Sequence, residues 1–231
     1  MKKRIFLASL ILALTTSVHS QNLFSKIKKG VNEAIDLIDQ DIKPTGKHGV
    51  LDLIIAPKIG LSANTLSGTT GKIEPGIMAG CYIEIFPLEQ LAVDMEICYG
   101  HQGINDVPHH FDGLGYGEYD ISLNYMNTSY MCRWYPIAEK PLSIYSGLTI
   151  SNLVSARING KGIHQGIKGD LHKGDFSIPI GVSYEWGQWQ ADIRYNHGLK
   201  RIASSPEMKS ILGKGTNSSL ALSIAYKIGI L

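Results

Sequence analysis

An alternating stretch, Asp175–Leu199, constrains the fold of this chain more than any other feature. In its first arm every second residue from Phe176 to Trp186 is apolar or aromatic, and the residues between them are mostly polar or small. Gly187-Gln188 is a two-residue connection of the kind that joins paired strands, and a second arm begins at Trp189. A period of two with aromatic residues near the turn is typical of transmembrane β-strands.

The same alternation recurs along the chain and predicts eight extended runs. The second, fourth and sixth connections are short, and the others are long and rich in Gly, His, Asn and Lys. Outer-membrane barrels have short periplasmic turns and longer extracellular loops. We therefore expect an all-β fold, an eight-stranded antiparallel up-and-down transmembrane β-barrel over residues 50–231. The runs lie at roughly 51–64, 75–87, 91–103, 119–135, 141–157, 174–187, 188–201 and 217–231.

The small residues indicate which face points inward. Alternation alone is also compatible with a soluble barrel, which would place its apolar face inside. Glycines weaken a strand unless a close approach requires them, and a narrow eight-stranded lumen supplies that crowding. The polar face is therefore predicted to line the lumen and the apolar face to meet lipid. The glycines that share the polar face are Gly60, Gly76, Gly80, Gly100, Gly147 and Gly181.

Charged residues of both signs also fall on the polar face. We predict a lumen charge network in which they pair and hold the barrel rigid, because buried charges need partners. A small polar pore is the functional alternative, but eight strands leave an interior that side chains can fill. The predicted network consists of Glu84, Asp94, Glu96, Arg133, Glu185, Asp192 and Arg194; Lys58, Arg157 and Lys227 share its face.

The fourth run breaks the alternation. Ile121, Leu123 and Tyr125 take one parity, and the apolar residues from Met126 onward take the other. A β-bulge near Tyr125 would reconcile the two halves. Alternatively, residues 120–124 project above the membrane as part of the loop.

Aromatic residues gather near the short turns and the end of the chain. This predicts an aromatic girdle at the periplasmic interface, although aromatic residues also favour strands in general. The predicted girdle consists of Phe86, Trp134, Trp186, Trp189 and Tyr226.

The first part of the chain differs from the alternating part. Residues 1–20 combine a basic start with a short apolar core, which predicts a secretory signal peptide. Residues 21–49 carry apolar residues at helical spacing and predict a short amphipathic helix and linker in the periplasm. Removing the leader removes three of the 22 basic residues and none of the 20 acidic ones. The resulting charge of about −1 gives no indication of nucleic-acid binding.

Several segments resemble outer-membrane β-barrel proteins of the porin-like PorT family. They are the chain from Gly147 onward, Asp175–Trp186, Ile193–Leu199, Pro57–Asn64 and Asp94–Gly103. The resemblance covers about residues 50–231. It implies an outer-membrane location and, in some members, a link to secretion. The final aromatic residue that such barrels often carry is missing, since the chain ends at Leu231.

No catalytic site is expected. Arg194–His197 resembles a motif of lipid A deacylases, which need a serine two residues after the histidine as the nucleophile. Leu199 stands at that position. The histidines of the long loops match no recognised metal-site spacing, and no cofactor is expected.

We therefore expect a non-enzymatic, monomeric outer-membrane protein that contacts outer-membrane lipid and acts as an envelope structural or interaction protein through its extracellular loops. A role as an accessory component of a secretion system, with an envelope or secretion protein as partner, is one alternative. A lipid A-modifying enzyme is the other, and Leu199 argues against it.

Overall fold

The computed structural model describes residues 49–111, 115–137, 140–160 and 162–229. The predicted signal peptide, 1–20, and almost all of the predicted periplasmic helix and linker, 21–49, lie outside these residues. The described strands are β1 (Leu53–Ser67), β2 (Lys72–Leu88), β3 (Leu91–Phe111), β4 (Gly115–Trp134), β5 (Leu142–Gly160), β6 (Ile163–Gly166), β7 (Gly174–Trp186), β8 (Trp189–Arg201), β9 (Thr216–Tyr226) and β10 (Ile228–Gly229).

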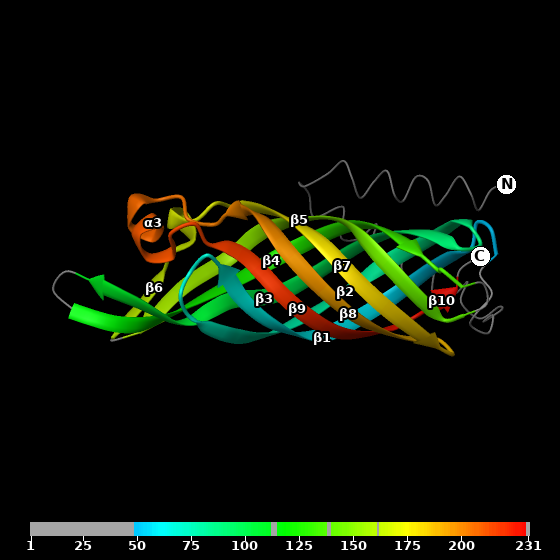
Figure 1. The fold of residues 1–231 in the computed structure, drawn as a ribbon, viewed down its shortest axis with the longest axis horizontal. Coiled ribbons are helices and arrows are strands. Elements are labelled where there is room, and N and C mark those ends of the chain that lie inside the picture. Colours follow the sequence, from blue (N-terminus) through cyan, green and yellow to red (C-terminus); the bar gives the residue numbers. More distant parts are fainter. Residues whose placement is uncertain (1–48, 112–114, 138–139, 161, 230–231) are drawn as a thin grey trace, which may run out of the picture. The chain divides into compact units, whose positions relative to one another are not determined.

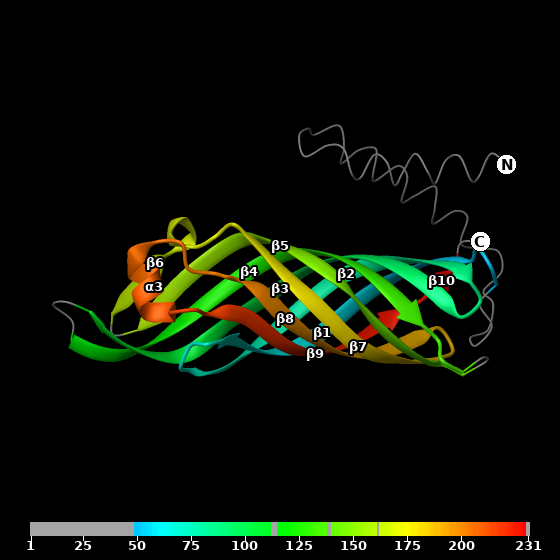
Figure 2. The same cartoon turned by 45° about the horizontal axis from the view of Figure 1, so that its top comes forward.

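Among the described strands, eight form a closed antiparallel ring (Figures 1 and 2). Each long strand pairs with the next along the chain, and β9 returns to pair with β1 through Lys58↔Ala225 and the register that follows. The short strands β6 and β10 add to β5 and β1. The predicted eight-stranded antiparallel architecture is confirmed.

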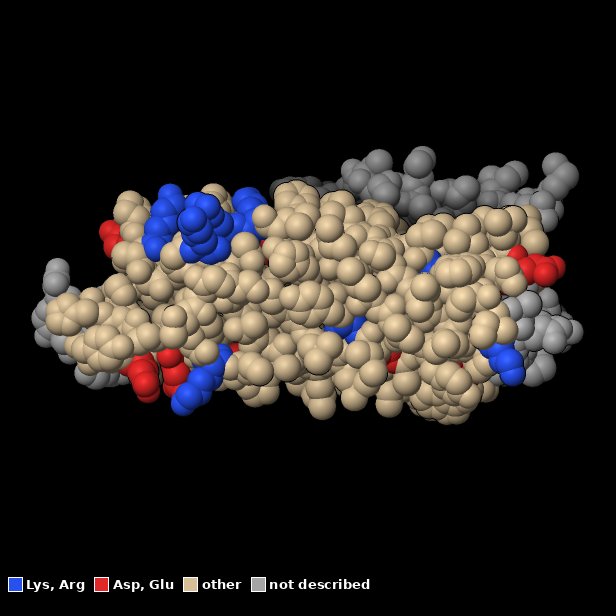
Figure 3. Space-filling view, viewed as in Figure 1, with Lys and Arg blue, Asp and Glu red and all other residues tan. Residues whose placement is uncertain are grey.

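The outer surface of the ring is apolar. Ile59 is 68% exposed, Ile77 is 68% exposed and Leu222 is 56% exposed, whereas their sequence neighbours on the other face point into the ring. Figure 3 shows this surface with only small areas of charge along the middle of the barrel, and the larger groups of acidic and basic side chains lie near its two ends. A barrel dissolved in water would bury these side chains, so the predicted inward direction of the polar face is confirmed.

Two inward glycines stand where no side chain fits. A Cβ added to Gly147 would lie 2.0 Å from the backbone oxygen of Tyr130 on β4, and one added to Gly181 would lie 2.3 Å from the Tyr145 ring. The first position lets neighbouring backbones approach closely, and the second makes room for a large aromatic side chain inside the lumen.

The two ends of the ring differ. We call the end with the short connections after β2, β4 and β7 the turn end, and the opposite end the loop end. At the loop end β3, β4 and β5 are longest, with 21, 20 and 19 residues. The predicted strands stopped near residues 103 and 119, but pairing of β3 with β4 continues past an irregularity between Ile104 and Val107. Beyond this bulge the β3–β4 pairing continues to Phe111 and Gly115, through residues that the sequence had predicted to form a loop.

The β-bulge predicted in the fourth run is wrong, because β4 keeps a single parity in which Tyr125, Ser129 and Arg133 all point inward. The unpaired residue lies on the neighbouring strand β5, at Val154. The register between β4 and β5 shifts between Asn124 and Tyr125. Below the shift the interior is polar, and above it Ile121, Leu123 and Tyr125 are fully buried on the inside. The extended strands thus have the opposite patterning, with an apolar inner face.

A short helix, α3 (Pro206–Leu212), covers that apolar face (Figure 1). It begins at Ser205, whose hydroxyl accepts a hydrogen bond from the Met208 amide, and Gly213 ends it with a φ of 57°. Its buried side chains join a cluster that we call the outer cap. The cap consists of Leu66, Ile104, Val107, Tyr119, Ile121, Leu123, Tyr125, Leu153, Ala156, Ile158, Ile167, Leu171, Ile202, Ala203, Met208, Ile211 and Leu212. Within the described part of the chain, no helix is long and apolar enough to cross a membrane.

The outer cap predicts a local stability effect. Leu212→Ala should destabilise the loop end by about 2–5 kcal/mol, because a fully buried leucine leaves a cavity there. Limited trypsin digestion of the detergent-folded protein should then cut faster at Lys209 and Lys214. The exposed substitution Ser210→Ala is the matched control. Equal cleavage of both variants and the wild type would contradict the packing role of α3.

Candidate functional site in the barrel lumen

The lumen near the turn end contains a layer of ion pairs, which we call the inner layer. The Arg133 guanidinium lies 2.8 Å from Asp94 Oδ2 and 3.2 Å from Glu84 Oε1. Lys227 Nζ lies 2.6 Å from Glu84 Oε2 and 2.5 Å from Glu185 Oε1. These residues come from β2, β3, β4 and β7 and from the position that follows β9. Four strands and the link between β9 and β10 are therefore joined across the barrel interior.

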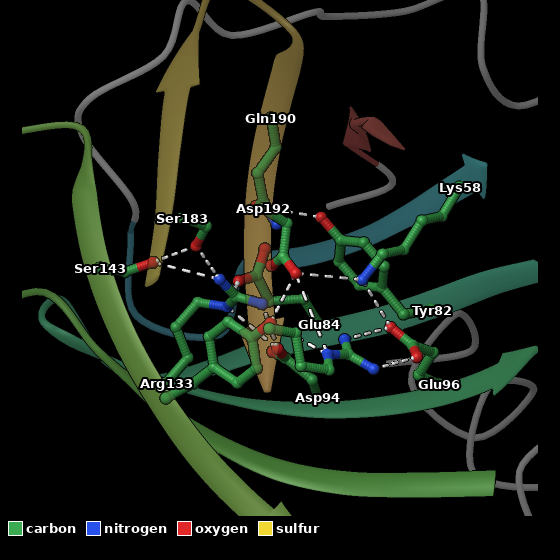
Figure 4. Close-up of polar contacts among 12 residues, drawn as sticks. Lys58, Tyr82, Glu84, Asp94, Glu96, Arg133, Ser143, Ser183, Gln190 and Asp192 are labelled. Carbon is green, nitrogen blue, oxygen red and sulfur yellow. Dashed lines mark hydrogen bonds and ion pairs between the residues drawn. The ribbon is translucent and has the colours of Figure 1, made fainter. Parts of the chain in front are cut away.

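A second layer lies further toward the loop end, and we call it the outer layer. Arg194 binds Glu96 with both terminal nitrogens, at 2.6 and 2.7 Å. Lys58 Nζ lies 3.0 Å from Glu96 Oε2 and 3.5 Å from Asp192 Oδ1. Figure 4 shows Lys58, Glu96 and Asp192 converging from different strands. Two-pronged pairing of arginine with a carboxylate fixes geometry as well as charge.

Tyr145 connects the two layers. The Arg133 guanidinium carbon lies 4.5 Å from its ring centroid, and that of Arg194 lies 5.4 Å away. Its hydroxyl donates to Asp192 Oδ1 at 2.6 Å and accepts from Arg194 Nε at 3.0 Å. The ring occupies the space that Gly181 leaves open. Cation–π contacts of this kind strengthen when the groups are shielded from water.

Hydroxyl groups complete the inner layer. Arg133 Nη1 donates to Ser143 Oγ at 3.1 Å and also to Ser183, and the two serine hydroxyls lie 2.6 Å apart. The Tyr135 hydroxyl donates to Glu185 Oε1 at 2.6 Å. Small hydroxyl residues therefore fill the narrow interior and satisfy donors that the carboxylates do not reach.

The structure brings the seven residues of the predicted network into these two layers, and each side chain is buried. Lys58 and Lys227 belong to the layers as well. Arg157 does not, because the bulge in the β4–β5 pairing precedes it and leaves it exposed. Sequence reasoning missed Tyr135 and Tyr145; their alternation parity with Arg133 and Ser143 was the available signal.

A polar cavity of about 40 Å³ lies between the outer layer and the outer cap. Its lining includes Glu96 and Arg194 together with serine, threonine and asparagine side chains. The side-chain oxygens of Asn64, Asn127 and Asn217 are buried there without a hydrogen-bond partner among the described residues. The volume has room for a few water molecules, which would satisfy these acceptors.

Four of the five predicted girdle residues lie at the turn end with partly exposed rings. Trp134, Trp186 and Trp189 are 44–48% exposed, and the Trp189 ring packs edge-on against Tyr226 at 5.0 Å. Phe86 does not belong with them, and its prediction is wrong. It is fully buried against Ile54, Ala92 and Tyr135, because it shares the inward parity of Tyr82 and Glu84. Nearness to a turn was a weaker guide than parity.

His197 and Leu199, the two positions that decide the enzyme reading, lie on the outer surface. His197 stacks on Tyr195 with ring centroids 6.3 Å apart, and Leu199 is 54% exposed on the same face of β8. No hydroxyl or thiol nucleophile stands at position 199. Within the described residues, no group of three or more His, Cys, Asp or Glu side chains could hold a metal ion.

A closed antiparallel ring with an apolar exterior and a lumen filled by paired charges defines a β-barrel of the transmembrane class. Solved structures to which the chain is similar include neisserial surface protein A, with 11% identity, 80% of this chain and 99% of that chain covered, and a TM-score of 0.47. For Ail of Yersinia pestis, in complex with the heparin analogue sucrose octasulfate, the identity is 12%, the match covers 78% of this chain and 99% of that chain, and the TM-score is 0.45. For the outer membrane protein OprG of Pseudomonas aeruginosa, the identity is 12%, the match covers 80% of this chain and 97% of that chain, and the TM-score is 0.40.

No family model matches the sequence, and no curated protein matches it. The class assigned here therefore depends on the closed sheet and its surface rather than on a relative.

The outer layer predicts a strong and specific effect on stability. Arg194→Met should lower the free energy of unfolding by about 3–5 kcal/mol, because it leaves the buried Glu96 with Lys58 alone. The double variant Arg194→Met/Glu96→Gln should recover part of this loss, since the unpaired charge is gone. Urea unfolding in detergent measures both.

The matched control is Lys72→Met, which removes an exposed ion pair with Asp106 at 2.8 Å. Its unfolding midpoint should stay at the wild-type value. A double variant as unstable as Arg194→Met would contradict the importance of charge pairing in the lumen.

Proposed function

We propose that this chain is a non-enzymatic outer-membrane protein that seals its own lumen and acts in the envelope through its loop end. The observation that carries the proposal is the closure of the lumen at three levels. Two layers of ion pairs cross its inner part, and the outer cap fills its outer part. A barrel filled in this way offers surfaces for contact but no wide path for solutes.

The membrane location is supported by the exterior. An apolar belt surrounds the ring, and Trp134, Trp186 and Trp189 lie at one margin of it. Bacterial proteins that cross a bilayer with a closed sheet belong to the outer membrane. We propose the turn end as the periplasmic side and the loop end as the extracellular side, since short turns face the periplasm in such barrels.

Further elements of the proposal come from the sequence. Residues 1–20 would direct export, and residues 21–49 would form a periplasmic helix and linker. The protein would act as a monomer in contact with outer-membrane lipid, without a cofactor and without binding nucleic acid. Membership of the porin-like PorT family is part of the proposal, and so is a partner from a secretion system.

The lipid-modifying alternative has little support in the lumen or on the surface. It would need a nucleophile beside His197. Leu199 occupies that place and points away from the barrel interior, as His197 does.

Heat modifiability and conductance together test the proposed function. The folded protein should migrate differently on a gel before and after boiling, and it should fractionate with the outer membrane. Reconstituted in planar bilayers, it should give no stable open channel, whereas a 16-stranded porin in the same bilayers conducts. Recovery as a soluble protein without a gel shift would overturn the membrane location. Steady conductance by the folded protein would overturn the sealed lumen.

A further inference from the structure

Two segments at the loop end form one continuous surface. The first, residues 167–173, joins β6 to β7, and the second, residues 202–215, joins β8 to β9. The His172 amide donates to the Ile202 oxygen at 2.8 Å, and the amides of Ser204 and Ser205 donate to the Asp170 oxygen at 2.9 and 3.0 Å. Backbone hydrogen bonds therefore hold the two segments side by side.

The surface is fixed from below by the outer cap. Ile167 and Leu171 of the first segment are buried in it, as are Ile202, Met208 and Ile211 of the second. The residues between these anchors point outward. Side chains that project from a packed base lose less freedom on binding than those of an unattached loop.

The charged side chains among them are mostly basic. We call this surface the basic patch, and it consists of Lys168, Lys173, Lys209 and Lys214 of the two segments together with Arg201 at the end of β8. The same segments carry only Asp170 and Glu207 as acids. Among the described residues, no carboxylate lies within ion-pair distance of a patch residue. Figure 3 shows basic side chains gathered beside α3, outward of the apolar belt.

The patch lies directly outside the lipid-facing surface. Arg201 follows Leu199 on the outward parity of β8, and Leu199 is 54% exposed. Lys173 immediately precedes β7, where Phe176 is 42% exposed. In a bilayer, the phosphate groups of the outer leaflet lie at the level just beyond the hydrocarbon.

On the β2–β3 side of the loop end, the exposed lysine is paired with an acid. Lys72 forms an ion pair with Asp106, and Glu118 stands nearby on β4. Its hydrogen bond and ion pair with Asp106 raise the pKa of Lys72, so the lysine stays protonated and the Asp106 carboxylate balances its charge. The patch above β7 and β8 has no such compensation within the described chain, and it is the side on which an anion would be attracted.

We propose that the basic patch binds the phosphate groups of an outer-leaflet glycolipid whose acyl chains lie against Phe176 and Leu199. Arginine binds phosphate with two parallel hydrogen bonds, and lysines add point charges around it. Apolar and basic groups at adjacent levels match a lipid, which presents chains below its phosphates. This inference rests on the membrane location proposed above.

Native mass spectrometry of the folded full chain in detergent tests the inference. The probes are bis-phosphorylated lipid A, the same lipid A after removal of both phosphates, and inorganic phosphate. The wild type should retain the phosphorylated lipid at least about tenfold more tightly than the dephosphorylated one. Lys173→Gln/Arg201→Gln/Lys209→Gln should abolish this preference.

The control removes three exposed bases outside the patch, Lys72→Gln/Lys140→Gln/Arg157→Gln, and should keep the preference. A gel shift on boiling checks that each variant is folded. Equal affinity for both lipids, equal loss in both triple variants, or saturation by inorganic phosphate alone would overturn the inference. If the folded wild type fractionates with the outer membrane but shows no lipid preference, the patch is refuted and the proposed function stands.

Discussion

The pairing of β9 with β1 is the constraint on which the rest of this structure depends. Inside a bilayer no water is available for unpaired backbone amides and carbonyls, so a sheet can cross only when it has no open edge. The β1–β9 register removes that edge from Lys58 to Ser67. Closure then divides all side chains into two groups, those that meet lipid and those that share a narrow lumen.

The lumen shows what closure demands of the sequence. Charges that enter it lose their hydration, so each needs a partner of opposite charge. Arg194 on β8 reaches Glu96 on β3, and Arg133 on β4 reaches Asp94 and Glu84. Two of these ion pairs, Arg194–Glu96 and Arg133–Glu84, also cross-link strands that share no backbone hydrogen bonds. Rigidity and obstruction of the lumen therefore have one physical cause.

The loop end follows a different rule, with an apolar interior and polar side chains outside. Above the shift at Asn124, the inner face of β4 becomes apolar and packs under α3. Such a reversal of patterning is what a strand needs when it passes from lipid into water, in line with the membrane location proposed above. The reversal lets one strand, β4, serve both environments, and it places the basic patch on a firm base next to lipid.

The period of two was sufficient to predict the strands, the ring and the inward polar face, because every residue in a strand is assigned to a face by its parity. It also placed Glu96, Arg133 and Arg194 in the lumen. It could not predict which acid pairs with which base in the lumen, since that depends on the stagger between strands. It missed α3, although Ser205-Pro206 and Gly213 mark its ends. Phe86 was misplaced because its position near a turn was given more weight than its parity.

Site-directed spin labelling along β8 in proteoliposomes tests the central claim most directly. Labels at positions 191, 193 and 195 should collide with oxygen, which concentrates in lipid. Labels at 190, 192 and 194 should be shielded both from oxygen and from a water-soluble nickel reagent, in a background that replaces Cys81, Cys98 and Cys132. A period of two in oxygen accessibility would support a lipid-facing apolar surface around a packed lumen. High nickel accessibility at position 193 would contradict it.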